Sequence, residues 1–302
     1  MSFGQEPQAL LEEALDAEVV VDLNKLKEAA RRGVPPQYRS TLYRYFLGVA
    51  SVDKSGEMSS SQWQEAGWST LLSSTSLASA SSRLETLSML PKQGFSATIY
   101  LLDAPRRMRF IKVIDALRVA HTFVSAELMC DFISIAAVFD SVFQHGNGSA
   151  QDVFYCSEAV ISMLCCGNNV LSDSDALRRE CARFLTLFRT TNPELYHHFI
   201  REGVPFFEWL PRMLTALLST NLHEDDLLRL WDNYLSDALV EGGFPMHSFV
   251  CLALLDYFRE QLVELDKMEI LTFLSAFPRL NVDRVFQEAR QIREFVRSRG
   301  LV

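Results

Sequence analysis

The 302-residue sequence predicts an all-α protein. Apolar residues recur every three to four positions along most of the chain, which is the period of an amphipathic helix. Only 13 glycines and 10 prolines interrupt the chain, so long helices and few turns are expected. No segment alternates strand and helix patterns, and no similarity recurs at a fixed period. These observations favour a helical domain over an α/β fold or an α-solenoid.

The first third of the chain predicts short helices followed by a serine-rich insertion. Residues 1–32 are expected to hold N-terminal helices, the first over residues 7–21. The segment Gly33-Val-Pro-Pro36 ends that part, and its prolines open a helix that carries Tyr38 and Phe46. Twelve serines follow between Ser55 and Ser88, together with Trp63 and Trp68. Because a pure linker carries few apolar residues, we expect an insertion at about residues 51–105 with one or two short helices.

The remaining two thirds of the chain predict consecutive helices joined by short breaks. The run from Gln151 to Cys166 is almost entirely apolar and is therefore expected to be buried. Ser172 or Ser174 can cap the helix after it, and Asn192-Pro193 can start another. The apolar periodicity of residues 281–302 predicts a C-terminal amphipathic helix. The helices expected here span residues 106–124, 126–143, 151–166, 174–189, 193–202, 203–218, 223–235, 246–263, 267–277 and 282–299.

Composition and charge exclude several classes of function. Lys plus Arg number 29 and Asp plus Glu number 38, so the net charge is −9. A chain this acidic is a poor candidate for binding nucleic acid or an anionic membrane. No run of about 18 apolar residues predicts a membrane span, and no secretory signal opens the chain. The six cysteines lack a C-x-x-C pair, which favours reduced thiols and a cytoplasmic location.

The motifs of several enzyme classes are missing. The sequence has no phosphate-binding G-x-x-x-x-G-K-[ST], no G-x-G-x-x-G and no G-x-S-x-G. The adjacent His197 and His198 would point about 100° apart on a helix, which makes a poor metal-binding pair. We therefore expect no cofactor, no bound metal and no nucleotide held by this chain itself.

Two distant motifs together resemble a known family. Gly33-Val-Pro-Pro-Gln-Tyr-Arg39 leads into Tyr43, and Leu227-Leu-Arg-Leu-Trp-Asp232 comes far downstream. This order resembles the TBC domain, the Rab GTPase-activating module, whose opening motif has a tryptophan where this chain has Tyr43. The resemblance covers about residues 33–280. It implies an all-α fold with two helical subdomains.

The resemblance also implies two residues that act on a partner GTPase. Family members bind a GTP-loaded Rab, which carries the GTP and Mg²⁺, and insert an arginine and a glutamine into its nucleotide site. The arginine motif I-x-x-D-x-x-R-T falls on Asp115 and Arg118, which makes Arg118 the arginine finger, oriented by Asp115. The simpler interpretation of this pair is a surface ion pair worth about 0.2–0.5 kcal/mol.

The glutamine motif Y-x-Q-G-M falls on residues 155–159, and Ser157 replaces the glutamine finger. Serine lacks the carboxamide that would orient water, and Glu158 adds a negative charge beside it. Tyr155 can equally be a core aromatic. These departures predict a regulatory protein that is not an enzyme, a pseudo-GAP with degraded fingers.

The departures leave alternatives open for the function. Within the family, the short chain and lost fingers are most similar to the small TBC subunit of the tuberous sclerosis complex. That likeness implies a coiled-coil scaffold or a Rab- or Rheb-type GTPase as partner, without membrane insertion, and a location peripheral on endomembranes. The alternative function is an active Rab GTPase-activating protein that uses Arg118. A third interpretation is an unrelated helical scaffold with the same motif order.

Overall fold

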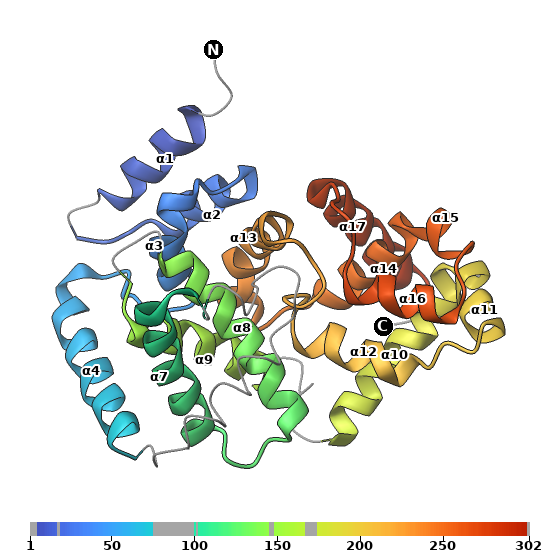
Figure 1. Cartoon of the computed structure of the whole chain (residues 1–302). Helices are drawn as coiled ribbons and strands as arrows, with labels where there is room; N and C mark the ends of the chain where they lie inside the picture. The colour runs from blue at the N-terminus through green and yellow to red at the C-terminus, as the bar shows by residue number, and fades with distance from the viewer. Residues whose placement is uncertain are drawn as a thin grey trace.

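The computed structural model describes residues 5–16, 19–74, 100, 102–144, 148–166 and 174–300. Helices dominate these ranges, and the only β-type pairing within them is one antiparallel bridge between Val20 and Asp53. Figure 1 shows two groups of helices side by side, one built mainly from the first half of the chain and one from the second. The prediction of an all-α fold is therefore confirmed.

The first group contains the helices that precede residue 167, together with α13. Here α7 packs against α4, α8 and α9, while α2 and α3 contact α13. The helices of this group are α1 (Gln5–Leu15), α2 (Leu23–Arg32), α3 (Pro36–Phe46), the 3₁₀ helix η1 (Lys54–Gly56), α4 (Glu57–Ser74), α7 (Ala104–Ala120), α8 (Ala126–Gln144), α9 (Ala150–Cys166) and α13 (Glu224–Glu241).

The second group surrounds α14, against which α17 packs along much of its length. As predicted, α17 begins at Val282, and it buries Val285, Ala289 and Val296. Asn281 caps its first turn by accepting a hydrogen bond from the backbone N–H of Arg284. The helices of this group are α10 (Ser174–Thr191), α11 (Pro193–Arg201), α12 (Phe206–Thr215), α14 (His247–Tyr257), α15 (Arg259–Leu262), α16 (Lys267–Ser275) and α17 (Val282–Ser298).

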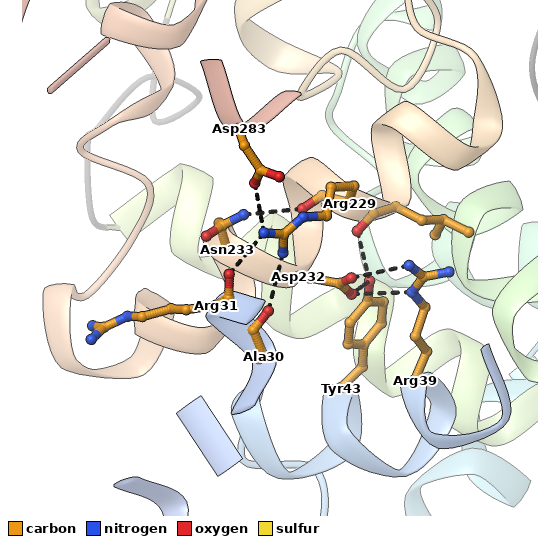
Figure 2. Close-up of polar contacts among 9 residues, drawn as sticks. Ala30, Arg31, Arg39, Tyr43, Arg229, Asp232, Asn233 and Asp283 are labelled. Atoms are coloured by element: carbon orange, nitrogen blue, oxygen red, sulfur yellow. Dashed lines mark hydrogen bonds and ion pairs between the residues drawn. The ribbon is translucent and has the colours of Figure 1, made fainter. Parts of the chain in front are cut away.

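A buried ion pair fastens α13 to α3 in the first group (Figure 2). The Arg39 guanidinium donates two hydrogen bonds to the carboxylate of Asp232, at 3.0 and 3.1 Å. The Tyr43 hydroxyl donates a third, 2.7 Å long, to the same carboxylate. The Asp232 side chain is fully buried and that of Arg39 is only 13% exposed. The two sequence motifs that carried the family resemblance thus meet in one network.

Arg229 on α13 connects the beginning of the described chain with its end (Figure 2). Its guanidinium donates to the backbone carbonyls of Ala30 and Arg31, at 3.1 and 2.7 Å. It also forms a 2.6 Å ion pair with Asp283 at the start of α17. One side chain of α13 therefore bonds to both the C-terminal end of α2 and the first turn of α17.

The structure corrects three predicted helix boundaries. The first helix ends at Leu15 rather than at residue 21, and residues 246–263 form two helices, α14 and α15, which meet at Phe258. The helix expected over residues 203–218 spans only Phe206–Thr215. It stops because Leu217 and Leu218 adopt φ of 48° and 62°, a left-handed conformation that is rare for leucine.

Two further predictions lie partly outside the described residues. Of the serine-rich insertion, the structure describes α4, and residues 75–99 and 101 are not described. The Ser172 cap is likewise outside the described ranges. Within those ranges, no helix combines the length and the apolar character needed to cross a bilayer.

Candidate functional site

The helix that carries the predicted arginine, α7, is fixed to α8 at its N-terminal half. Asp140 of α8 is fully buried and accepts from the guanidinium groups of Arg106, at 2.6 Å, and Arg109, at 2.7 Å. The Tyr100 hydroxyl donates to the same carboxylate at 3.1 Å. Because two cations and a hydroxyl surround one buried anion, the axis of α7 is held firmly.

Asp115 and Arg118 lie on the last two turns of α7. Asp115 is buried, whereas Arg118 is half-buried. The helix continues past both residues to Ala120, where the backbone N–H of His121 closes the last turn on the carbonyl of Leu117. Asp115 therefore faces the interior, and the interpretation of the two residues as a surface ion pair does not describe its position.

Cys130 of α8 lies near the contact between α8 and α12, where the two helical groups meet. Burial raises the pKa of its thiol, and the positive charges of Arg212 and Arg118 act in the opposite direction. Arg212 belongs to α12 and forms a 3.3 Å ion pair with Asp131 of α8. The Thr215 hydroxyl also donates to Asp131. Burial raises the pKa of Asp131 to about 6 despite these partners.

Ser157 does not reach the surface. Its side chain is fully buried, and its hydroxyl donates a 2.6 Å hydrogen bond to the carbonyl of Val153, one turn earlier in α9. A buried hydroxyl that is satisfied within its own helix is a structural feature. The residue predicted to replace the glutamine finger therefore cannot contact a partner in this conformation.

Tyr155, the aromatic residue of the same motif, faces α4. Its hydroxyl donates a 2.8 Å hydrogen bond to the carbonyl of Gln64. A Cβ atom on Gly67 would lie only 2.7 Å from the Tyr155 hydroxyl oxygen, so the glycine is what permits this close approach. Tyr155 consequently connects two helices, in line with its interpretation as a packing aromatic.

Glu158 and His121 form a pair that the sequence alone did not suggest. The His121 Nε2 atom lies 2.7 Å from Glu158 Oε2 and links the end of α7 to α9. The His121 side chain is 17% exposed and that of Glu158 is 30% exposed. One signal was present in the sequence: His121 follows Arg118 by three residues, which places both on one face of a helix end.

A fully exposed aromatic residue follows on the connection between α7 and α8. Phe123 is 101% exposed, only five residues after Arg118. A large apolar side chain in this position has no packing role within the described chain, which is typical of a residue that contacts another protein. Arg118, His121 and Phe123 thus lie within six residues of one another at the C-terminal end of α7.

Comparisons with known proteins place this geometry in context. Residues 131–263 match the family model for the Rab-GTPase-TBC domain. The GTPase-activating protein gyp1 of Schizosaccharomyces pombe is 23% identical over 290 residues, which cover 87% of this chain. TBC1 domain family member 13 of Homo sapiens is 32% identical over 149 residues, which cover 47% of it.

Solved structures give the same fold. The crystal structure of the Ypt/Rab-GAP domain of Gyp1p superposes with a TM-score of 0.70 at 16% identity, covering 96% of this chain and 97% of that one. The Chlamydomonas flagellar RabGAP TBC domain superposes with a TM-score of 0.65 at 17% identity, with 96% and 91% covered. The predicted TBC fold is therefore confirmed.

The similarity extends over only part of each relative. The matched segments cover 55% of the fission yeast protein and 36% of the human protein. Arg118 and Asp115 precede the segment that matches the family model, whereas Ser157 lies inside it.

The prediction that this chain is not an enzyme is wrong. The yeast relatives of S. pombe and Saccharomyces cerevisiae are both named GTPase-activating proteins, and the first aligns along most of this chain. The prediction depended on Ser157 in place of the glutamine finger and on the negative charge of Glu158. Because the Ser157 side chain is buried, its identity does not describe what the surface presents.

Proposed function

We propose, from the premise that this chain carries the TBC domain of the Rab-GAP family, that it accelerates GTP hydrolysis by a small GTPase of the Rab type. The premise is supported by the family model, by the yeast relatives and by the shared fold. The GTPase would supply the GTP and the Mg²⁺, and this chain would supply side chains to its nucleotide site.

The observation that supports the proposal is the position of Arg118 in the structure. It lies on the last turn of a helix that Asp140 fixes in place, and it is half-buried rather than free to move widely. A guanidinium presented in this way can neutralise charge that develops on the γ-phosphoryl group during its transfer. We assign Asp115, one turn earlier and buried, as the residue that orients this part of α7.

The partner surface would be the end of α7 around the exposed Phe123. A Rab-type GTPase is favoured because the similar proteins whose names specify a target are called Ypt/Rab-GAP or RabGAP proteins. A Rheb-type GTPase and a coiled-coil scaffold stay predictions from the sequence resemblance. We also propose that the chain reaches endomembranes from the cytoplasm through its GTPase.

Single-turnover GTP hydrolysis by a panel of GTP-loaded Rab proteins tests the proposal. The purified chain should accelerate hydrolysis by at least one of them. Arg118→Ala should remove about 10³-fold of that acceleration, the lower end of the range for an arginine finger. Lys112→Ala is the matched control, because Lys112 is an exposed cation on the same helix. Absence of acceleration with every Rab tested would refute the proposal.

A further inference from the structure

A cavity of about 250 Å³ lies between α13 of the first helical group and α17 of the second. Its walls are the C-terminal part of α13, the connection from α13 to α14, and the middle of α17, which lie side by side in Figure 1. Small-molecule sites are concave and largely apolar, with a few polar groups that fix the ligand. The apolar part of this wall consists of Tyr234, Phe244, Pro245, Met246 and Phe286.

Three arginines of α17 supply the polar part of the wall. Arg290, Arg293 and Arg297 follow one another by three and four residues, so they lie on one face of the helix. The Arg290 guanidinium lies over the Phe286 ring, 4.9 Å from its centroid, and this stacking helps to orient it. A guanidinium presents five N–H donors in a planar fork that matches a phosphate group. This face of α17 is therefore suited to an anion.

Arg293 is part-buried beside the cavity and has no counterion there. Its guanidinium donates to the thioether sulfur of Met246 at 3.2 Å, and this sulfur is a weak, uncharged acceptor. Among the residues that the structure describes, no carboxylate lies within ion-pair distance of any of the three arginines. Removing a cation from water without an opposite charge costs free energy. An anion in the cavity would offset that cost.

The carboxylates of the same wall do not cancel the positive charge. Asp237 is already compensated, because it forms a 3.2 Å ion pair with Arg31 of α2. Glu241 and Glu294 also line the cavity and are exposed to solvent. Three arginines against these two glutamates leave one positive charge in excess, on a chain whose net charge is −9. The cavity thus departs from the overall charge of the protein in the direction that favours an anionic ligand.

We propose that this cavity binds a small ligand with a phosphomonoester group, which the arginines of α17 hold while the aromatic wall covers its organic part. Such a group carries about −1.5 to −2 charge at pH 7 and three acceptor oxygens, so it can accept from two guanidinium groups at once. The volume is just below the range of about 300–1,000 Å³ that drug-sized ligands occupy, so one sugar ring with its phosphate is the appropriate size. The bound ligand would contact both helical groups and hold α17 against α13.

A phosphomonoester can come from a soluble metabolite or from a lipid headgroup, and isothermal titration calorimetry with two probes separates these sources. The soluble probe is glucose 6-phosphate, with glucose as its control. The lipid probe is a vesicle of phosphatidylcholine and phosphatidic acid, with phosphatidylcholine alone as its control. Binding of either probe in preference to its control supports the site and identifies the source. If neither probe binds better than its control, the proposal is overturned.

Substitutions on α17 test whether the probe binds in this cavity. Arg293→Gln should lower the affinity for the bound probe about tenfold or more, because it removes hydrogen bonds between charged groups. Arg297→Gln should lower it as well, and its exposed position keeps the test valid if Arg293→Gln fails to fold. Arg284→Gln is the matched control, since Arg284 lies on the same helix outside the cavity wall and pairs with Glu288 at 3.1 Å. An affinity that Arg297→Gln and Arg293→Gln leave at the wild-type value would overturn the assignment of the site.

Glu241→Gln should change the affinity in the opposite direction. It removes a negative charge from the cavity wall and leaves the arginines in place, so it should raise the affinity about two- to fivefold. General damage to the fold would lower the affinity, which makes an increase specific to charge. A lower affinity in a Glu241→Gln protein that unfolds at the wild-type temperature would show that the ligand is recognised by the carboxylate, and the proposal would again be overturned.

Discussion

At the scale of single residues, the Asp232 carboxylate is a fully buried anion whose partners lie on another helix. It accepts from Arg39 and Tyr43 while fully removed from solvent. A buried charge is stabilising only while its partners remain, because an unpaired ion in the interior has lost its hydration without compensation. The network therefore makes α3 and α13 strongly dependent on each other.

Arg39→Ala should lower the free energy of unfolding by about 3–5 kcal/mol, because it leaves Asp232 buried without a cation. Tyr43→Phe removes one hydrogen bond and should lower it by about 1 kcal/mol. The matched control is Arg279→Ala, whose ion pair with Asp225 is exposed to solvent and should contribute little to stability. Urea denaturation measures all three. Equal losses for Arg39→Ala and Arg279→Ala would contradict the argument.

A second residue-scale prediction concerns Asp131. Its folded pKa of about 6 lies above the value of about 3.9 for an unfolded aspartate, so the folded state binds the proton more tightly. Stability from this group is therefore present at low pH and is lost as pH rises between about 4 and 6. Asp131→Asn removes the titration and keeps an oxygen that can accept from Thr215.

The expected signature is a difference between two proteins at two pH values. Relative to wild type, Asp131→Asn should gain about 1 kcal/mol more stability at pH 7 than at pH 5, as measured by urea denaturation. The comparison cancels the other titrating groups, which both proteins share. A gain that is the same at both values would mean that Asp131 is already ionised at pH 5.

At the scale of helices, the sequence predicts well which segments are helical, but it predicts poorly where some of these helices end. The face of α17 that carries Val285 and Ala289 is buried as its periodicity indicates. The end of α12 escaped prediction because two leucines, strong helix formers, adopt positive φ there. The hydrogen bond from Trp231 Nε1 to the carbonyl of Leu217 belongs to tertiary packing, which local propensity does not contain.

The sequence likewise predicts only part of the candidate site. The periodicity predicts Arg118 within a helix over residues 106–124, and the structure puts it on the last turn of α7, which ends at Ala120. The direction of Ser157 could not be predicted, because α9 is apolar almost all round and such a helix has no pattern that fixes its rotation. For the same reason the sequence did not show that Glu158 would point towards His121.

The contact between α14 and α17 gives a prediction at the element scale. Val285→Ala removes two methyl groups from a position that is 1% exposed and should lower the free energy of unfolding by about 1–3 kcal/mol. Gln287→Ala on the exposed face of the same helix should change it by less than about 0.5 kcal/mol. If the two variants unfold at the same urea concentration, α17 does not stabilise the domain through this face.

At the scale of the whole molecule, Arg229 couples segments that lie far apart in the chain. It bonds to α2 and α17 at the same time, so its loss should lower the local stability of both helices. Arg229→Ala should raise amide hydrogen exchange about tenfold both at the end of α2 and in the first turn of α17, which corresponds to a loss of about 1.4 kcal/mol. Mass spectrometry of peptic peptides measures this.

The control for that prediction is again an exposed pair. Arg279→Ala should leave exchange in α2 unchanged, since Arg279 forms its ion pairs with Asp225 and Asp226 at the start of α13. Faster exchange confined to α17 in Arg229→Ala would show that the two carbonyl contacts at α2 contribute nothing.

The place of α13 among the early helices has a consequence for synthesis on the ribosome. Arg39 and Asp232 are separated by 193 residues, so the partner of a side chain made early emerges only much later. At about 5–20 residues per second, that interval lasts on the order of 10–40 seconds. During this time Arg39 and Tyr43 stay hydrated and the surface of α3 that α13 will cover stays open. The α13-binding surface of α3 must therefore stay exposed until the last third of the chain has been synthesised. During this period the nascent chain is most exposed to aggregation, and binding by a chaperone would protect it most.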